Sequence, residues 1–597
     1  MADLKERCRE VVSSAINKFA SDSGLEVSVT PDSLVLETPP KPELGDVGIP
    51  MFPFAKVLRM GPPVIAQKIV ELIKDVPEAL EAGEFLAVGP YVNIKLNKAV
   101  AISNILNKIE SENDSYGSFD ENGKKALEGR RVMVEFSSPN TNKPLHLGHL
   151  RNDALGESVS RILKAAGADV YKVNIINNRG VHICKSMLAY QKFHAPAGDT
   201  PESLGLKSDR FVGDCYVEFD KWNKTDSSAE KMAQDLLVKW EQGDEEVHKL
   251  WKQMNDWAIS GIQQTYERTG VSFDKLYYES DTYLKGKEEI LKGLADGIFY
   301  KEEDGSVWVD LEEIGLDKKV LLRKDGTALY MTQDIGTAIY RHGDWAFNQL
   351  VYVVGSEQQY HFKVLFYVLN KLGYEWADQL YHLSYGMVNL PEGKMKSREV
   401  TVVDADDLIN SLRDGALEEI SAKGREDAVG NPEAVAEKIA LGALHYYLLQ
   451  ATPTKDMLFN PKESLSFNGD TGPYLQYMGA RICSILRKAQ ETGVSVASFD
   501  KASNLLTHEA EWNLVKLLGE YPKVVAKAAS TLDPSQVAGY LYDVAKSFGR
   551  FYHDCPALGI ALDNPELASA RLALMSVTKK VLENGMDLIL VPFLETM

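Results

Sequence analysis

The chain has 597 residues, 44% hydrophobic and 25% charged, which is typical of a globular protein of two to four domains and excludes a disordered or fibrous one. It has no apolar run near the roughly 18 residues of a membrane helix and no signal-peptide core, so we expect a cytoplasmic protein. Five scattered cysteines without a CxxC pair argue against disulfides or a structural zinc site.

The net charge of −20 by itself argues against a polyanionic partner. The charge is unevenly distributed, however: residues 199–320 hold 16 basic and 28 acidic side chains, and residues 321–470 hold 14 and 21. The first 198 residues are balanced, and the last 127 are nearly so. Whole-chain charge therefore does not exclude a local nucleic-acid site.

Residues 1–112 are predicted to form an N-terminal α/β domain. A helix opens it between Leu4 and Phe19, and strand-like runs follow at Glu26–Thr30, Ser33–Glu37 and Tyr91–Leu96. The polar stretch Ser111–Lys125 is predicted to be a linker.

Residues 126–404 show strand–helix alternation, interrupted by an acidic, aromatic-rich segment at 190–320. The predicted strands are Arg131–Phe136, Val170–Ile176, Ala328–Met331, Leu350–Val354 and Leu380–Val388. Helices are predicted at Leu147–Ala166, from the end of the Ala328–Met331 strand to about His342, and at Tyr360–Leu372. We expect one α/β Rossmann-type nucleotide-binding domain split by an insertion at 190–320. Residues 405–597 are helical nearly throughout and predict an all-α bundle.

The most specific motif is His-Leu-Gly-His at 146–149, between a buried strand and the helix that follows it. His146 and His149 share one face of a helix start, and Gly148 removes a side chain between them. A helix N-terminus suits phosphate, and two imidazoles there could donate hydrogen bonds as charge develops.

A second motif, Gly-Lys-Met-Lys-Ser-Arg at 393–398, follows the last predicted strand. Its three cations, Lys394, Lys396 and Arg398, could neutralise a departing pyrophosphate. Alone, such a run is usually a solvated loop; its position after the second half of a split sheet makes it informative.

Together the two motifs resemble the HIGH and KMSKS signatures of class I aminoacyl-tRNA synthetases. The flanking sequences resemble arginyl-tRNA synthetases in particular: VEFSSPNTNKPLHLGHLR (134–151), DGTALYMTQDIGTA (325–338), GSEQQYH (355–361), GPYLQYMGARICSILRK (472–488), FYHDCPAL (551–558) and GDVGIPMFPFAK (45–56). The resemblance implies a ligase that activates L-arginine with ATP to arginyl-adenylate and esterifies the 3′ end of its tRNA. ATP would bring Mg²⁺ as a substrate complex, with no structural metal.

The resemblance also implies roles for individual residues. Those expected to act on ATP are His146, His149, Lys143 and Lys394 as catalytic groups, with Pro139, Gly148, Lys396, Ser397 and Arg398 as further contacts. Those expected to bind arginine are Glu135, Asn140, Tyr330, Asp334 and Gln358. Ser397 stands where KMSKS has its second lysine. The family often replaces that lysine with the one just upstream of HIGH, which is Lys143 here. Lys396 is the other candidate for the same role on the phosphates.

For tRNA, the C-terminal region interleaves aromatic and basic residues, on which unstacked bases could stack. The resemblance implies anticodon-loop contacts at Tyr474, Tyr477 and Met597, and elbow contacts at Tyr91 and Asn93 of the N-terminal domain. About half of the C-terminal aromatic residues are expected to be bundle core instead.

Three alternatives stay open at this point. A class I synthetase for another amino acid would keep both motifs and change the pocket. A non-catalytic tRNA-binding relative is disfavoured by intact His146, His149 and Lys394. A tRNA-independent nucleotidyltransferase would have no use for the helical C-terminal region.

Overall fold

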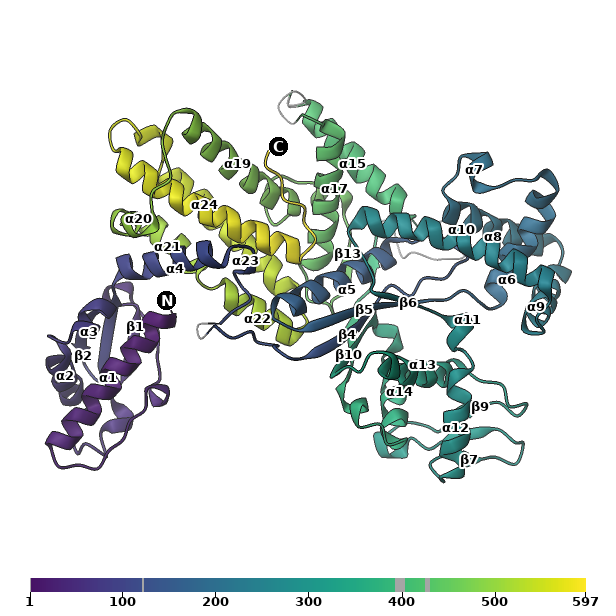
Figure 1. The fold of residues 1–597 in the computed structure, drawn as a ribbon, viewed down its shortest axis with the longest axis horizontal. Coiled ribbons are helices and arrows are strands. Elements are labelled where there is room, and N and C mark those ends of the chain that lie inside the picture. The colour runs from purple at the N-terminus through teal and green to yellow at the C-terminus, as the bar shows by residue number, and fades with distance from the viewer. Residues whose placement is uncertain (1, 121–122, 392–402, 423, 425–429) are drawn as a thin grey trace.

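The computed structural model describes residues 2–120, 123–391, 403–422, 424 and 430–597. The molecule is elongated, with the N-terminal unit at one end and a helical insertion at the other (Figure 1). The central sheet and the C-terminal helices lie between them. Among the described helices, none is long and apolar enough to cross a membrane.

The N-terminal unit packs three helices against a three-stranded antiparallel sheet in the order β1-β3-β2. Its elements are α1 (Ala2–Asp22), β1 (Val47–Pro50), α2 (Pro62–Ile73), α3 (Pro77–Ala82), β2 (Gly83–Val88) and β3 (Tyr91–Leu96). The predicted strand at Tyr91–Leu96 is confirmed. The strands predicted at Glu26–Thr30 and Ser33–Glu37 are wrong: Pro31–Ser33 is a 3₁₀ turn, and only Glu37 pairs, with Gly48. Proline fixes φ and lacks an N–H, which favours a turn there.

The central sheet has five parallel strands in the order β11-β10-β4-β5-β6. They are β4 (Arg131–Glu135), β5 (Asp169–Ile176), β6 (Lys275–Tyr278), β10 (Gln349–Gly355) and β11 (Leu380–Tyr385). The chain starts in the middle at β4, builds outward to β6, and returns to β4's other side with β10. This confirms the Rossmann-type parallel sheet predicted from the sequence. Such sheets bind ligands at the carboxyl ends of the strands where the order reverses.

Helices connect and cover these strands. They are α4 (Lys98–Glu112), which leads in from the N-terminal unit, α5 (Leu147–Ala165) between β4 and β5, α13 (Tyr330–Asp344) before β10, and α14 (Gln359–Lys371) between β10 and β11. The strand predicted at Ala328–Met331 is wrong. Ala328 forms a single bridge with Leu322, and α13 begins two residues later, at Tyr330.

The segment expected as one insertion, 190–320, is interrupted by β6 of the central sheet. Before β6 the helices α6 (Val181–Ala189), α7 (Pro201–Leu204), α8 (Ser208–Thr225), α9 (Ser228–Glu241) and α10 (Glu245–Thr269) enclose a core of their own. After it come α11 (Glu279–Thr282), α12 (Lys285–Ala295) and a small antiparallel sheet of β7 (Tyr300–Lys301), β8 (Val307–Val309) and β9 (Lys319–Leu322). Tyr277 of β6 is buried in the sheet's core, so the register of this short strand depends on packing.

The C-terminal region is a helical bundle that packs on α5. Its helices are α15 (Ala405–Ala422), α17 (Pro432–Leu449), α18 (Pro461–Ser464), α19 (Gly472–Glu491), α20 (Phe499–Leu505), α21 (Glu509–Leu518), α22 (Tyr521–Thr531), α23 (Ser535–Asp554) and α24 (Pro565–Leu588). One short strand, β13 (Met457–Leu458), pairs with β12 (Val388–Asn389) of the catalytic region. Through this pairing the bundle is joined to the strand that precedes the Gly-Lys-Met-Lys-Ser-Arg motif.

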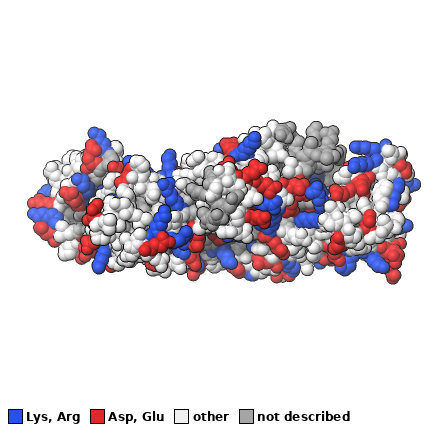
Figure 2. Space-filling view, turned by 90° about the horizontal axis from the view of Figure 1, so that it is seen from above, with Lys and Arg blue, Asp and Glu red and all other residues white. Residues whose placement is uncertain are grey.

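Charge is mixed over the upper side of the molecule. Figure 2 shows acidic and basic side chains interspersed over the described residues visible in that view. The net charge of −20 is thus not collected there into one acidic face.

Candidate active site

The His-Leu-Gly-His motif caps the helix that follows the central strand. His146 is the N-cap of α5, and its Nδ1 accepts a hydrogen bond from the Gly148 N–H at 3.1 Å. In return His149 Nδ1 accepts from the His146 N–H, also at 3.1 Å. The two rings lie 4.0 Å apart, centre to centre. The motif therefore satisfies two of the N–H groups that a helix start leaves unpaired.

This capping fixes where the imidazole protons lie. Burial lowers the pKa of His146 to about 4, with the charge of Lys143 adding to the effect, and burial lowers the pKa of His149 well below its ordinary value. Both rings are neutral at pH 7. Since each Nδ1 accepts a backbone N–H, each proton is on Nε2. Among the described residues neither Nε2–H has a partner, so the motif presents two donors.

Gly148 and Lys143 complete this part of the site. A Cβ on Gly148 would lie 3.0 Å from the His146 ring, so glycine lets that ring lie across the helix start. Lys143 is half-buried, and burial lowers the pKa of its ammonium group. Its charge contributes to lowering the pKa of both histidines.

The loop between β4 and the motif has an unusual backbone. Ser137 and Ser138 have φ of 76° and 51°, a conformation that non-glycine residues adopt rarely and that is concentrated at functional sites. The side-chain oxygen of Asn174 accepts from the Ser138 N–H at 3.0 Å, and the Pro139 carbonyl accepts from the Asn177 N–H at 3.0 Å. This bracing leaves Pro139 buried and Asn140 exposed at the carboxyl edge of the sheet.

The second motif lies outside the described residues, and with it the predicted site residues Lys394, Lys396, Ser397 and Arg398. The described chain resumes beside the first motif: Asp404 pairs with His146, and the Ala405 N–H donates to the Leu145 carbonyl at 2.9 Å. The segment that follows the second motif therefore contacts the His-Leu-Gly-His motif.

Glu135, expected to bind arginine, already has a cationic partner. It ends β4, is 7% exposed, and forms an ion pair with Arg341 of α13, which is 1% exposed. Burial raises the pKa of Glu135, and the Arg341 guanidinium acts against that rise. Guanidinium atoms Nε and Nη2 of Arg341 are buried without a hydrogen-bond partner. The pair is thus nearly fully desolvated.

The other expected arginine contacts are more accessible. Tyr330, the first residue of α13, is 76% exposed. Asp334, one turn later, has a side chain 42% exposed and accepts from His361 Nε2 at 2.6 Å. Its charge contributes to raising the pKa of Glu135, which places the two carboxylates near one another. Gln358 is exposed.

Sequence reasoning missed three residues of this region. Arg341 and His361 partner the two predicted carboxylates, and Asp153 of α5 is 2% exposed with neither carboxylate oxygen hydrogen-bonded. His361 lies at the end of the GSEQQYH segment, and that context was a usable signal. Arg341 and Asp153 carried none, because one charged residue in a helix is usually solvated. A large cavity of about 1130 Å³ between α5 and α24 contains none of the predicted residues.

The residues expected at the anticodon end are partly brought together. Tyr477 of α19 and Met597 line one pocket of about 300 Å³ with Ile439 and Phe467. Tyr474 packs against Tyr542, with ring centres 5.9 Å apart. Phe548 and Phe551 are fully buried, which confirms that part of the aromatic set is bundle core.

The two residues expected at the tRNA elbow differ in access. Tyr91 begins β3 and packs edge-on against Phe52, which is 55% exposed. Asn93, two residues on along the same strand, is only 4% exposed, and a Cβ built on Gly48 would lie 3.0 Å from its side-chain oxygen. By strand alternation it lies on the same face of β3 as Tyr91, opposite the apolar side chains of Val92 and Ile94, but it is covered there and is less accessible to RNA than Tyr91.

Comparisons with known proteins agree with this organisation. Family models match three regions: "tRNA synthetases class I (R), catalytic domain" at residues 117–461, "DALR anticodon binding domain" at 475–597, and "Arginyl tRNA synthetase N terminal domain" at 6–96. The chain is 58% identical to the arginine–tRNA ligase of Treponema denticola, with all of both chains covered. It is 46% identical to that of Bacteroides thetaiotaomicron, over 97% of this chain and 98% of the relative.

Solved structures give the same result. Thermus thermophilus arginyl-tRNA synthetase matches with a TM-score of 0.74 at 26% identity, covering 99% of this chain and 100% of that one. Arginyl-tRNA synthetase from Plasmodium falciparum shares the fold, with a TM-score of 0.71 at 20% identity and 99% of each chain covered. On the identity over its full length and the match of its catalytic region, the chain belongs to the class I arginyl-tRNA synthetases.

Proposed function

We propose that this chain carries out the arginine–tRNA ligase reaction of its family at the carboxyl edge of the central sheet. L-Arginine reacts with ATP to form arginyl-adenylate and pyrophosphate, and the arginyl group then passes to the 3′ end of its tRNA. The observation that carries this assignment is the cap geometry of the two histidines, in which each Nδ1 accepts a backbone N–H. Both rings are neutral, capped through Nδ1, and present Nε2–H at the N-terminus of α5.

Two neutral donors at a helix start suit the transferring phosphate. They add no fixed charge to bind ATP in the ground state, and they hydrogen-bond to oxygens whose charge grows in the transition state. The N–H groups of α5 add to this field. Lys143, together with Lys394 of the second motif, would neutralise the β- and γ-phosphates, and Mg²⁺ would enter with ATP.

Arginine recognition is assigned mainly to the accessible carboxylate. Asp334 is part-exposed and can take a guanidinium fork, with Tyr330 beside it as a wall. Glu135 lies deeper, and its charge is already balanced by Arg341. We therefore assign Glu135 a hydrogen-bonding and orienting role, together with Asn140 and Gln358.

For tRNA, we assign the anticodon loop to the C-terminal bundle and the elbow to the N-terminal unit. Tyr477 and Met597 share a pocket into which an unstacked base could fit, and Tyr474 lies one turn away on the same helix. Tyr91 supplies the N-terminal contact. Asn93 would act only by supporting β3.

The test is ATP–pyrophosphate exchange with each of the twenty amino acids, with and without the arginine tRNA. Of the twenty amino acids, only arginine should support exchange. Exchange with a different amino acid instead of arginine would refute the assignment and favour a synthetase of different specificity.

The pocket assignment is tested with Asp334→Asn. This variant should raise KM for arginine by at least about tenfold, since a charge-assisted bond is worth roughly 1.5–3 kcal/mol, and leave KM for ATP unchanged. Asp296→Asn, at an exposed position after α12, is the matched control. An unchanged KM for arginine in the Asp334 variant would remove Asp334 from the pocket.

A further inference from the structure

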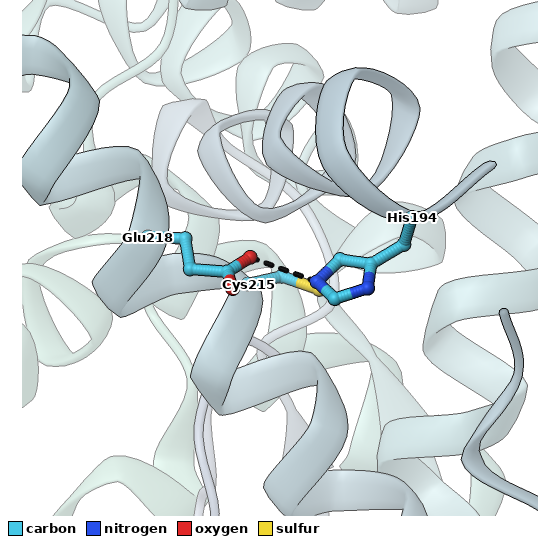
Figure 3. A group of neighbouring side chains, drawn as sticks. All are labelled: His194, Cys215 and Glu218. Atoms are coloured by element: carbon cyan, nitrogen blue, oxygen red, sulfur yellow. Dashed lines mark hydrogen bonds and ion pairs between the residues drawn. The ribbon is translucent and has the colours of Figure 1, made fainter. Parts of the chain in front are cut away.

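A cluster in the insertion brings together three different metal-binding side chains. His194 ends the segment after α6, and Cys215 and Glu218 lie one turn apart on α8. One ligand atom from each lies within 4.8 Å of the other two. Figure 3 shows the three side chains pointing toward one another. Within the described part of the chain, this is the one such group of histidine, cysteine and carboxylate side chains found.

The His194 ring has a carboxylate on each nitrogen. Nδ1 lies 3.0 Å from Asp199 Oδ2, and Nε2 lies 2.8 Å from Glu218 Oε2. A neutral imidazole has one N–H and can donate to only one of them. The second contact therefore needs either a protonated carboxyl group or a positive group at Nε2, a second ring proton or a metal ion.

Two features favour a metal ion over a proton alone. A histidine that ligates zinc through one nitrogen almost always donates from the other to a carboxylate or carbonyl, and Asp199 stands in that position. The third group is a thiol: Cys215 is fully buried, and its Sγ lies within 4.8 Å of the ligand atoms of His194 and Glu218. A hydrogen bond between His194 and Glu218 does not involve this sulfur, whereas zinc and other borderline-soft ions bind sulfur ligands well.

We propose that the insertion binds one zinc ion through His194 Nε2, Cys215 Sγ and a Glu218 carboxylate oxygen, with solvent as the fourth ligand. Zinc lies roughly 2.0–2.3 Å from such donors, and the three ligand atoms already lie within 4.8 Å of one another. On binding, the thiol proton and the Nε2 proton pass to solvent. One Zn²⁺ thus replaces two protons, so the net charge of the cluster does not change on binding.

The ion would tie the 194–199 turn to α8. The turn is already closed by backbone bonds, Gly198 N–H to the Ala195 carbonyl and Asp199 N–H to the His194 carbonyl. Phe211, also on α8, packs edge-on against the His194 ring at 5.1 Å. The ligands are far apart in sequence and form no CxxC pattern, so the expectation of no structural metal did not weigh this combination.

The test uses the full chain, stripped with a chelator and titrated with zinc against a chromophoric competitor. We expect one zinc per chain, and with cobalt in its place a sulfur-to-metal charge-transfer band. Cys215→Ala should abolish the band and weaken zinc binding by more than about 100-fold, whereas Asp199→Asn should weaken it roughly 10–100-fold. Cys184→Ala is the matched control, a buried thiol of the same core, and should bind like the parent chain.

Two results would overturn the proposal. Zinc bound equally by the parent chain and by Cys215→Ala would place the ion elsewhere, and no binding by the folded parent would leave His194 as a protonated clamp. If Cys215→Ala does not fold, Glu218→Gln replaces it: this side chain is 36% exposed and its amide keeps the shape. Unchanged zinc affinity in that variant would also refute the site, and a loss of more than about 100-fold would support it.

Discussion

Replacing Asp153 by asparagine tests the electrostatics beneath the active-site loop. Asp153 follows the His-Leu-Gly-His motif on α5, is 2% exposed, and has no hydrogen-bond partner for either carboxylate oxygen among the described residues. Burial raises its pKa from the ordinary 3.8 to about 8. Folding at neutral pH therefore requires this carboxyl group to take up a proton.

The size of the effect follows from the two pKa values. Between pH 3.8 and about 8 the unfolded chain has Asp153 ionised and the folded chain has it protonated, so the folded state binds more protons. Stability then falls as pH rises, by up to ~1.4 kcal/mol per pH unit. Asparagine has the same shape and no proton to take up. Asp153→Asn should therefore be more stable by roughly 4 kcal/mol at pH 7, with the difference growing from pH 4 to pH 8.

Native-state hydrogen exchange of α5 is the suitable assay, because a chain of several domains has no single unfolding free energy. The opening free energy of α5 should depend on pH in the parent chain and much less in the variant. Asp235→Asn, on an exposed position of α9, should reproduce the parent. Lower protection in Asp153→Asn at pH 7, or parallel pH profiles, would refute this reasoning.

Three further predictions concern the active site and tRNA. Arg341→Met leaves the buried Glu135 carboxylate without its partner, which should cost roughly 3–5 kcal/mol of local stability and raise the pKa of Glu135 further; undiminished exchange protection of α13 would contradict this. Lys143→Ala should slow ATP–pyrophosphate exchange more than Lys396→Ala does, since Lys143 acts on both histidines; an equal or reversed effect would assign the second phosphate lysine to position 396. Affinity for tRNA should fall between low and moderate salt despite the net charge of −20, because local basic patches bind the phosphates. Filter binding at the two salt concentrations measures this, and an unchanged affinity would contradict the prediction.

Local pattern was enough to predict four of the five strands of the central sheet. The strands at Arg131, Val170 and Leu350 are rich in β-branched residues, and the strand at Leu380 is rich in leucine and tyrosine. The structure has strands at all four positions. The two strands predicted near Glu26 and Ser33 failed, where a proline and small polar residues satisfy the backbone in a turn instead.

The order of the motifs predicted that the catalytic residues lie at the carboxyl edge of the central sheet. The partners of these residues depended on packing. His146 and His149 are adjacent along one helix, so their spacing alone predicted a shared face. That both Nδ1 atoms accept backbone hydrogen bonds is a matter of cap geometry, which only coordinates show.

What the sequence determined by itself was the position along the chain of the motifs and of most strands and helices, because each is encoded within a few residues. The tertiary structure decided which distant charges meet. Arg341 reaches Glu135 across 206 residues of chain, β6 enters the central sheet from within the expected insertion, and His194 meets Cys215 and Glu218. Such pairings depend on which surfaces are buried together, and burial changes both the cost of a charge and the partners that it must have.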